Sequence, residues 1–182
     1  MELQPTRYDP SHSDLLLQFV SLHIACITRD HTIATFLPPL SHLKIHTWWQ
    51  DRANEVISGS RDILFVMAPN KSGEVIGVVM LREAEAETGP FRGTVEKLLV
   101  SPDWRRKGVG RALMKGLEDV AREKGKTLLM LDTETGSPAE QFYPDLGYVK
   151  VGVIPNYGIS PKDGTLKPET FFYKDLRTSK PL

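Results

Sequence analysis

The sequence predicts a mixed α/β (α+β) fold in which about seven strands form a mostly antiparallel sheet flanked by about four helices. Two segments with apolar residues at helical spacing precede most of the predicted strands. Apolar, β-branched runs with short turns between them follow, and a basic, glycine-bearing turn then separates one strand from a third helix. With 182 residues, of which 40% are hydrophobic, the chain can bury one sizeable core.

The first third of the chain predicts a short strand and two helices. A strand is expected at 3–8, and the turn at 9–11 leads into a helix over about 14–27. Ser41 can cap a second helix over about 43–58, where apolar and polar residues again alternate at helical spacing.

The middle of the chain alternates between strands and turns. Runs at 63–68 and 75–81 are rich in β-branched residues, and the turn formers between them predict a hairpin. A further strand is expected at 91–100, where a Ser-Pro pair ends it. Apolar residues then recur at helical spacing over 108–124, and Gly125 is a stop signal.

The last third predicts three strands and a short helix. A strand at 127–131 is followed by a helix that Ser137 can cap. Two final strands are expected at 148–154 and 170–173. The segment 155–168 between them is rich in proline and glycine and reads as a long loop, a kind of segment that often determines binding specificity.

Charge, cysteine content and hydropathy argue against several classes of protein. The formal net charge is zero, so no field over the whole surface attracts nucleic acid or an anionic membrane. Cys26 is the only cysteine, so it forms no internal disulfide and is expected to fill core space. Neither a secretory signal nor a membrane-spanning apolar run is recognisable. We therefore expect a cytoplasmic protein that binds neither nucleic acid nor membrane.

A basic turn connects the strand at 91–100 to the helix that follows it. Its sequence is Arg105-Arg106-Lys107-Gly108-Val109-Gly110. The first amide N–H groups of a helix lack intrahelical partners, and the glycines leave room for a phosphate to reach them. Together with Arg111, the basic side chains add positive charge, and guanidinium groups suit phosphate oxygens. The turn therefore predicts a phosphorylated ligand.

Other interpretations of this turn fit less well. A Walker motif needs a glycine, four further residues and then Gly-Lys-Ser or Gly-Lys-Thr, and the sequence contains no such complete pattern. A dinucleotide fingerprint needs a third small residue where Leu113 stands. The remaining alternative is a solvated basic turn before an ordinary amphipathic helix.

The turn and its flanks resemble the central signature of the GNAT superfamily of N-acetyltransferases. In that signature a valine and a nearby proline precede Arg or Gln-x-x-Gly-x-Gly or Ala. The corresponding segment is Leu98-Leu99-Val100-Ser101-Pro102-Asp103-Trp104-Arg105-Arg106-Lys107-Gly108-Val109-Gly110-Arg111-Ala112-Leu113. The resemblance covers roughly 94–173, and the segments 128–137 and 155–157 are most similar to small-molecule acetyltransferases typified by the tabtoxin-resistance protein.

The resemblance implies a sheet that is splayed in the middle and an acetyl-CoA cosubstrate whose pantetheine arm lies in the opening. It implies a single N-acetyltransferase domain over 1–182, with a cofactor-binding core at about 94–150 and an acceptor side from 10–60 and 155–168. No metal is needed. The residues expected to bind the cofactor are Leu99, Val100, Arg105, Arg106, Lys107, Gly108, Val109, Gly110, Arg111, Ser137 and Phe142.

The implied reaction is direct attack of a neutral amine on the thioester, which needs a base and a proton donor. Glu96, on the strand before the turn, is the first candidate for the base, after a modest upward shift of its pKa. Asp132 is the rival, either as base or as the group that holds the substrate ammonium. Tyr143 occupies the family's general-acid position, although Pro144 disfavours helical geometry at that tyrosine.

The expected acceptor is a primary amine of a small metabolite or antibiotic-like molecule. Trp48, Tyr157 and, more weakly, Asp163 are candidates to contact it. His42 and His46 lie four apart on a helix, but no nearby Glu or Cys completes a metal site. The alternatives are a protein or peptide acceptor, or a non-catalytic acyl-CoA-binding module, which the acid and base candidates speak against. We expect a monomer or a homodimer.

Overall fold

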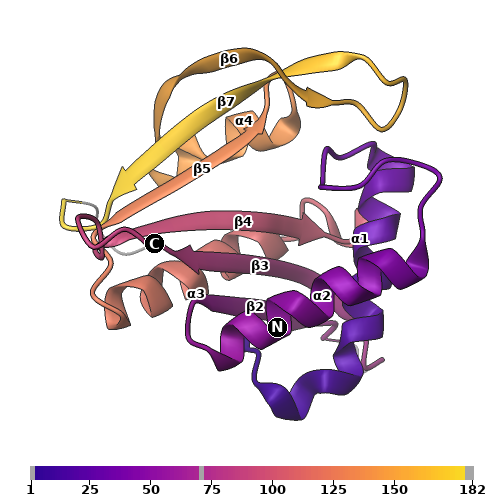
Figure 1. The fold of residues 1–182 in the computed structure, drawn as a ribbon, viewed down its shortest axis with the longest axis horizontal. Helices are drawn as coiled ribbons and strands as arrows, with labels where there is room; N and C mark the ends of the chain where they lie inside the picture. Colours follow the sequence, from indigo (N-terminus) through magenta and orange to yellow (C-terminus); the bar gives the residue numbers. More distant parts are fainter. Residues whose placement is uncertain (1–2, 70–71, 179–182) are drawn as a thin grey trace.

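The protein is described by a computed structural model that covers residues 3–69 and 72–178. Its strands form a seven-stranded sheet in the order β1-β2-β3-β4-β5-β7-β6 (Figure 1). The pair β4 and β5 is parallel, and all other neighbouring pairs are antiparallel. The predicted mostly antiparallel mixed sheet is therefore confirmed. The strands are β1 Thr6–Arg7, β2 Arg61–Met67, β3 Val75–Glu83, β4 Arg92–Val100, β5 Leu128–Glu134, β6 Val149–Ile159 and β7 Leu166–Asp175.

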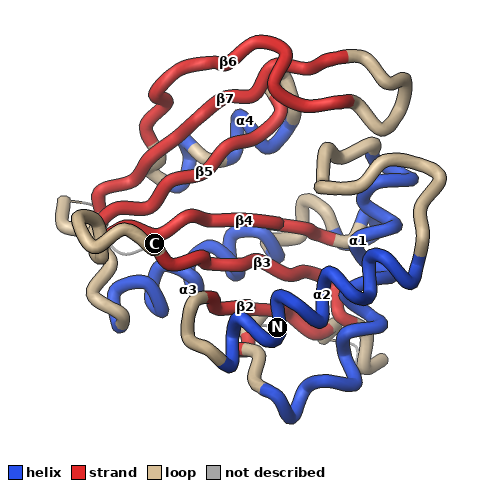
Figure 2. Tube along the Cα trace, in the orientation of Figure 1, coloured by secondary structure: helices blue, strands red, loops and turns tan. Residues whose placement is uncertain are grey.

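Helices cover both faces of the sheet, as Figure 2 shows. The α-helices are α1 Leu16–Asp30, α2 His42–Ile57, α3 Val109–Glu123 and α4 Pro138–Phe142. Short 3₁₀ turns are η1 Pro10–Leu15, η2 Pro102–Trp104 and η3 Pro144–Leu146. One apolar core lies between the sheet and α1 with α2, and the other lies between the sheet and α3 with α4.

Strand β3 belongs to both cores, which explains its continuous apolar sequence. Its Ile76 and Leu81 pack on the α3 side, whereas Val78 and Met80 pack on the side of α1 and α2. All four side chains are fully buried. A strand that is buried on both faces needs apolar residues at every position, so alternation is lost there.

The predicted long loop at 155–168 is wrong, because β6 continues to Ile159 and β7 begins at Leu166. β6 is the edge strand of the sheet, so Pro155 lies where a missing N–H is tolerated. The register is irregular between Ile154 and Gly158, and this irregularity takes up the extra residues of β6. The expected strand at 3–8 is likewise only Thr6–Arg7.

The sheet opens in its middle. β4 pairs with β5 only through Arg92 to Thr94, opposite Leu128 to Met130. Beyond these residues β4 runs on to Val100 and β5 to Glu134 without pairing, and Figure 1 shows the two strands diverging. The structure thus has the central opening that the family resemblance implies.

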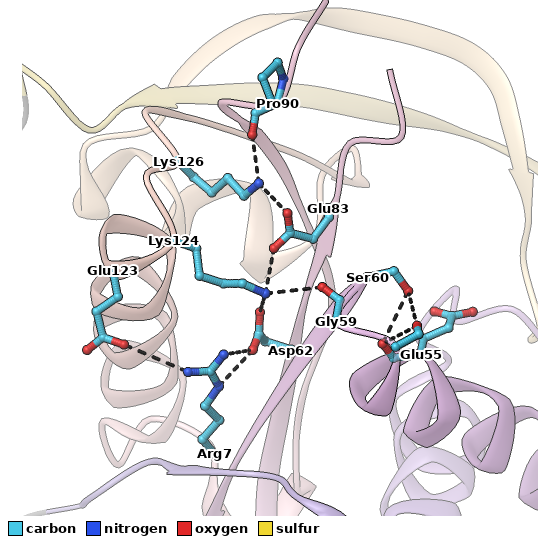
Figure 3. A network of polar contacts seen from close by, with 11 residues as sticks. Arg7, Glu55, Gly59, Ser60, Asp62, Glu83, Pro90, Glu123, Lys124 and Lys126 are labelled. Atoms are coloured by element: carbon cyan, nitrogen blue, oxygen red, sulfur yellow. Dashed lines mark hydrogen bonds and ion pairs between the residues drawn. The ribbon is translucent and has the colours of Figure 1, made fainter. Parts of the chain in front are cut away.

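A polar network fixes the C-terminal end of α3 to the first strands (Figure 3). Asp62 on β2 is 1% exposed and accepts hydrogen bonds from Arg7 on β1 and from Lys124 just after α3. The Lys124 Nζ also lies 2.6 Å from Glu83 Oε1, and Lys126 pairs with the same carboxylate. Because each carboxylate in this network already has cationic partners, we assign the network a structural role.

Candidate active site

The basic turn leaves its amide N–H groups free at the N-terminus of α3. Gly108 is the N-cap, with a φ of 83° that favours glycine. Among the described residues, no hydrogen bond uses the amides from Arg106 to Arg111. A Cβ added at Gly110 would lie 3.4 Å from the Phe142 ring, so the first turn of α3 packs closely against α4. The turn therefore offers several unpaired donors beside a helix of 15 residues.

The basic side chains of the turn divide into two groups. Arg105 pairs with Asp30 at the end of α1 at 2.8 Å, and Lys107 donates to the Asp103 carbonyl at 2.9 Å. Arg106 and Arg111 are exposed and make no hydrogen bond or ion pair with the described part of the chain. These two guanidinium groups are therefore the ones available to an anionic ligand.

The edge of β4 that faces the opening has no strand partner after Thr94. On its other edge, Leu99 pairs with Val78 and Val100 pairs with Gly77 of β3. The Leu99 side chain is 3% exposed, so only its backbone can contact a ligand in the opening. An unpaired strand edge presents the amide and carbonyl groups that a ligand can complete.

Glu96 lacks the upward pKa shift that its expected role as base requires. Arg61 donates to its carboxylate at 2.7 Å and Arg82 donates at 2.8 Å. Burial works to raise the pKa of Glu96, but the hydrogen bonds and charges of Arg61 and Arg82 outweigh it and lower the pKa. A carboxylate held in this way is a poor proton acceptor near neutral pH.

Asp132 lies on the face of β5 that looks toward α1 and α2. Its neighbour Leu131 is buried in the core beside α3, and successive side chains of a strand point to opposite faces. The Asp132 residue is exposed and is hydrogen-bonded to Glu169 of β7, which is 6% exposed. Pairing of Glu134 with Glu169 puts Glu169 on the same face as Asp132. The two carboxyl groups therefore act as a pair.

Burial, followed by the hydrogen bond and the charge of Asp132, raises the pKa of Glu169 to about 8. Glu169 thus holds a proton near neutral pH. The sequence prediction missed Glu169, because it was assigned to the end of a loop. The signal available was a carboxylate directly before the predicted strand at 170–173.

Tyr143 is buried in the core beside α3, on the opposite face of the sheet from Asp132. It is the C-cap of α4, has the helical angles φ −68° and ψ −40°, and is 5% exposed. Burial raises the pKa of Tyr143 strongly, and the charge of Asp132 adds to the shift. Pro144 begins η3, so α4 ends at Phe142 as the proline requires, while Tyr143 keeps helical geometry.

Ser137 caps α4, as its sequence context predicts. Its side chain accepts a hydrogen bond from the Glu140 amide at 3.4 Å. Ser137 lies before the first residue of the helix, and Phe142 at the other end contacts the start of α3. These contacts position Tyr143 relative to the basic turn.

The three residues that are expected to contact the acceptor molecule have different surroundings. Trp48 is half-buried, with the Arg52 guanidinium carbon 5.0 Å from its ring centre. Tyr157 on β6 is 52% exposed and its ring lies 5.2 Å from that of Phe171. Asp163 instead accepts hydrogen bonds from Thr165 and so orders the turn between β6 and β7. The structure therefore gives Asp163 a local structural role.

Lys97 is a second residue that the sequence prediction missed. It has a φ of 53° and lies at an irregularity of β4, where Lys97 and Leu98 together oppose Val79. Its Nζ lies 6.0 Å from the centre of the Trp48 ring. The adjacent charges of Glu96 and Lys97 inside an apolar strand were the signal for a bulge.

Within residues 3–69 and 72–178, no group of three or more His, Cys, Asp or Glu side chains could hold a metal ion. The described helices include none that is long and apolar enough to cross a membrane.

The structure is similar to that of the acetyltransferase yncA from Salmonella typhimurium, which was solved with its cofactor acetyl-CoA. The TM-score is 0.73 at 19% sequence identity, and the match covers 99% of this chain and 97% of that one. At this level of identity the similarity concerns the fold.

Two curated relatives differ in their acceptors. The chain is 24% identical over 151 residues to NAA20, the catalytic subunit of the N-terminal acetyltransferase B complex of Arabidopsis thaliana, covering 82% of this chain and 76% of that protein. It is 33% identical over 95 residues to the L-amino acid N-acyltransferase MnaT of Escherichia coli strain K12, covering 51% of this chain and 55% of that protein.

The model of the acetyltransferase (GNAT) family matches residues 27–148. This range contains β4, the basic turn, α3, β5 and α4, which together form the opening and its anion-binding end. The family uses acetyl-CoA, a ligand whose phosphates suit the free amides of such a turn. By sequence and by fold, this chain belongs to the GNAT family of acetyltransferases.

Proposed function

We propose that this protein transfers an acetyl group directly from acetyl-CoA to a primary amine of a small molecule, with no covalent enzyme intermediate. The main support is that Asp132 lies on β5 where β5 no longer pairs with β4, and that its charge acts on Tyr143, which is buried on the other face of the sheet. A proton acceptor and a proton donor in one neighbourhood are what aminolysis of a thioester requires.

The groups around the turn fit acetyl-CoA, which supplies the acetyl group as a thioester. The free amides from Arg106 to Arg111 and the two unpaired guanidinium groups suit the pyrophosphate. The unpaired edge of β4 at Leu99 and Val100 suits the amide groups of the pantetheine arm. Ser137 and Phe142 support this end of the site through α4.

Asp132 is our candidate for the group that binds the substrate ammonium and accepts its proton. It is exposed toward the acceptor side and lies beside Glu169, whose pKa is raised to about 8. A carboxylate in this position can bind an ammonium group by charge and accept its proton. Glu96 is instead assigned to fixing β4 through Arg61 and Arg82.

Tyr143 is our candidate for the group that stabilises the departing thiolate. Its raised pKa keeps the phenol protonated throughout the neutral range. The same shift makes complete proton transfer to sulfur harder, so a hydrogen bond from the phenol to the thiolate is its main contribution.

The acceptor side favours a small molecule over a polypeptide. A Cβ added at Gly158 of β6 would lie 3.2 Å from Ile33, in the segment after α1, and 2.9 Å from Glu169. The segment between α1 and α2 therefore reaches β6 across this side of the sheet. An extended peptide needs an open groove, whereas a small amine fits beneath such a crossing.

An amine panel tests the proposal. The protein is incubated with acetyl-CoA and single amino acids, other small amines or short peptides, and release of the CoA thiol is measured. We expect release with some small amines and little with peptides. Faster release with peptides would favour the protein-acceptor alternative, and acetyl-CoA binding without release for any amine would favour a non-catalytic binding module.

A further inference from the structure

The acceptor side of the opening contains a positive charge opposite a carboxylate pair. Lys97 projects from the irregular part of β4, where a φ of 53° removes its side chain from the usual alternation. Among the carboxyl groups, Glu96 beside it on β4 acts on Lys97 most strongly, followed by Asp132 on β5 and by Glu169 on β7 in its ionised form. Strands β4 and β5 no longer pair at this level and diverge (Figure 1), so Lys97 and Asp132 lie on the two strands that border the opening.

The Lys97 ammonium is not neutralised by direct contact. Within the described ranges, no hydrogen bond or ion pair joins it to Asp132, Glu169 or another carboxylate. Its contact is a cation–π interaction with the Trp48 ring. A half-buried ammonium without a counter-ion is costly. A ligand that brings an anionic group to Lys97 would remove that cost.

The neighbouring cations already have partners. Arg61 pairs with Glu55 and Glu96, and Arg52 also pairs with Glu55. The buried His23, whose pKa burial lowers to about 4, is neutral at physiological pH. Among these cations Lys97 is therefore the one that has no ionic partner within the described residues.

We propose that the acceptor is a zwitterion, a primary amine that bears an anionic group such as a carboxylate a few bonds away, with Lys97 binding the anionic group and Asp132 with Glu169 receiving the ammonium. This inference depends on the proposed function and narrows its substrate class. A free amino acid has both charges, whereas the N-terminal residue of a peptide has lost its carboxylate to an amide bond. Lys97 is thus a specificity-determining residue for free amino acids and similar zwitterions.

The test compares each amino acid of a panel with its own C-terminal amide. Binding of both to the protein saturated with CoA is measured by calorimetry, and thiol release from acetyl-CoA is measured in parallel. A charge-assisted hydrogen bond from Lys97 predicts that the preferred acid binds about 10- to 100-fold more tightly than its amide. Lys97→Met should remove most of this preference and Lys97→Arg should keep much of it.

Lys115→Met is the matched control, because Lys115 is an exposed lysine on α3 that makes no hydrogen bond or ion pair with the described residues. The control should keep the full preference for the acid, and acetyl-CoA affinity should be unchanged in all three variants. Equal binding of acid and amide by the wild-type protein, or an unchanged preference in Lys97→Met, would overturn the proposal. Preferential binding of the acid without thiol release would support the recognition of the carboxylate by Lys97 but would contradict the proposed acetyl transfer. Failure of the zwitterion proposal and failure of the proposed function therefore give different results.

Discussion

At the scale of single residues, Tyr143 combines deep burial with proximity to a carboxylate. Both features raise its pKa, so the phenol stays protonated near neutral pH, as the proposed stabilisation of the departing thiolate requires. Removing only the hydroxyl in Tyr143→Phe should lower the turnover number by about 10²- to 10⁴-fold. Affinity for acetyl-CoA, measured by calorimetry, should change little because the ring still packs against Phe142 and Tyr148.

Tyr173→Phe is the control for this prediction. Tyr173 lies on β7 and is 38% exposed, away from the face that packs on α4. Its variant should retain the wild-type turnover number. If Tyr143→Phe did so as well, Tyr143 would have no role in the departure of the thiol.

The raised pKa of Glu169 predicts that the free energy of unfolding depends on pH. Its pKa is about 8 in the folded protein against an ordinary value of 4.5, with burial as the largest cause and Asp132 as the next. Between these values the folded chain binds a proton that the unfolded chain has released, so this group lowers the free energy of unfolding as pH rises. Glu169→Gln cannot lose a proton, so its stability relative to wild type should increase across the same range.

Urea unfolding at several pH values between about 5 and 9 measures this difference. The exposed Glu87→Gln is the control, and its stability should follow that of the wild type at each pH. Parallel curves for Glu169→Gln and wild type would contradict the protonated carboxyl pair.

Residue identities alone could not have revealed this pair or its relation to Lys97. Asp132 was recognisable as a carboxylate at the end of a strand, but its partner is 37 residues further on and is set by the β5 and β7 register. The orientation of Lys97 depends on a positive φ within β4. Neither register nor a single dihedral angle follows from hydrophobic periodicity.

At the scale of elements, the basic turn and α3 were predicted closely because several local signals coincide there. Glycine, basic residues and helical periodicity all favour the same boundary, and α3 begins at Val109. The hairpin of β6 and β7 was predicted poorly, since proline and glycine at an edge strand give the same signal as a loop. Local sequence patterns therefore predict a helix such as α3 better than they predict a strand at the edge of a sheet.

The first turn of α3 supports a prediction about cofactor affinity. Gly110→Glu adds a carboxylate beside the free amides and close to Phe142, where a phosphate is expected. Affinity for acetyl-CoA should fall at least about 100-fold, while a carboxylate near a helix N-terminus leaves the folded state intact. Calorimetry and thermal unfolding measure the two effects.

Lys115→Gln controls for charge, because it also makes the protein more negative by one unit on the same helix. It should bind acetyl-CoA like the wild type. Undiminished binding by Gly110→Glu would remove the turn as the pyrophosphate site.

A buried ion pair joins α3 to β7 and supports a prediction about stability. Lys174 is 1% exposed, Glu118 is 0% exposed, and the Lys174 Nζ lies 2.7 Å from Glu118 Oε1 and 2.7 Å from the Leu146 carbonyl oxygen. Glu118→Ala leaves the ammonium buried without its anion and should lower the free energy of unfolding by about 3–5 kcal/mol. The double variant Glu118→Leu, Lys174→Met should recover most of this loss.

Urea unfolding of the single and double variants measures the effect. A single variant as stable as the wild type would mean that Lys174 finds another partner or loses its proton at little cost. The ion pair links α3, whose first turn is the proposed pyrophosphate site, to β7, which also contains Glu169. It therefore holds these two parts of the proposed site in place relative to each other.

At the scale of the whole molecule, the sheet consists of two parts that are joined weakly. Strands β1 to β4 form one part and β5 to β7 form the other, and they pair only through Arg92 to Thr94 opposite Leu128 to Met130. The helices contribute further contacts, since α3 and α4 share one core with strands of both parts. A ligand that fills the opening would supply the contacts that the two central strands do not make with each other.

Acetyl-CoA should therefore protect a defined set of amides from hydrogen exchange. We expect slower exchange at the amides from Arg106 to Arg111 and at those amides of β4 after Thr94 that face the opening, because neither set has a hydrogen-bond partner among the described residues. Amides of β3, which pairs on both sides, should change little because the sheet already protects them. At a concentration about 100 times its dissociation constant, the ligand should stabilise the fold by about 2.7 kcal/mol. The Gly110→Glu variant should show neither effect, and protection confined to β6 and β7 would place the ligand outside the opening.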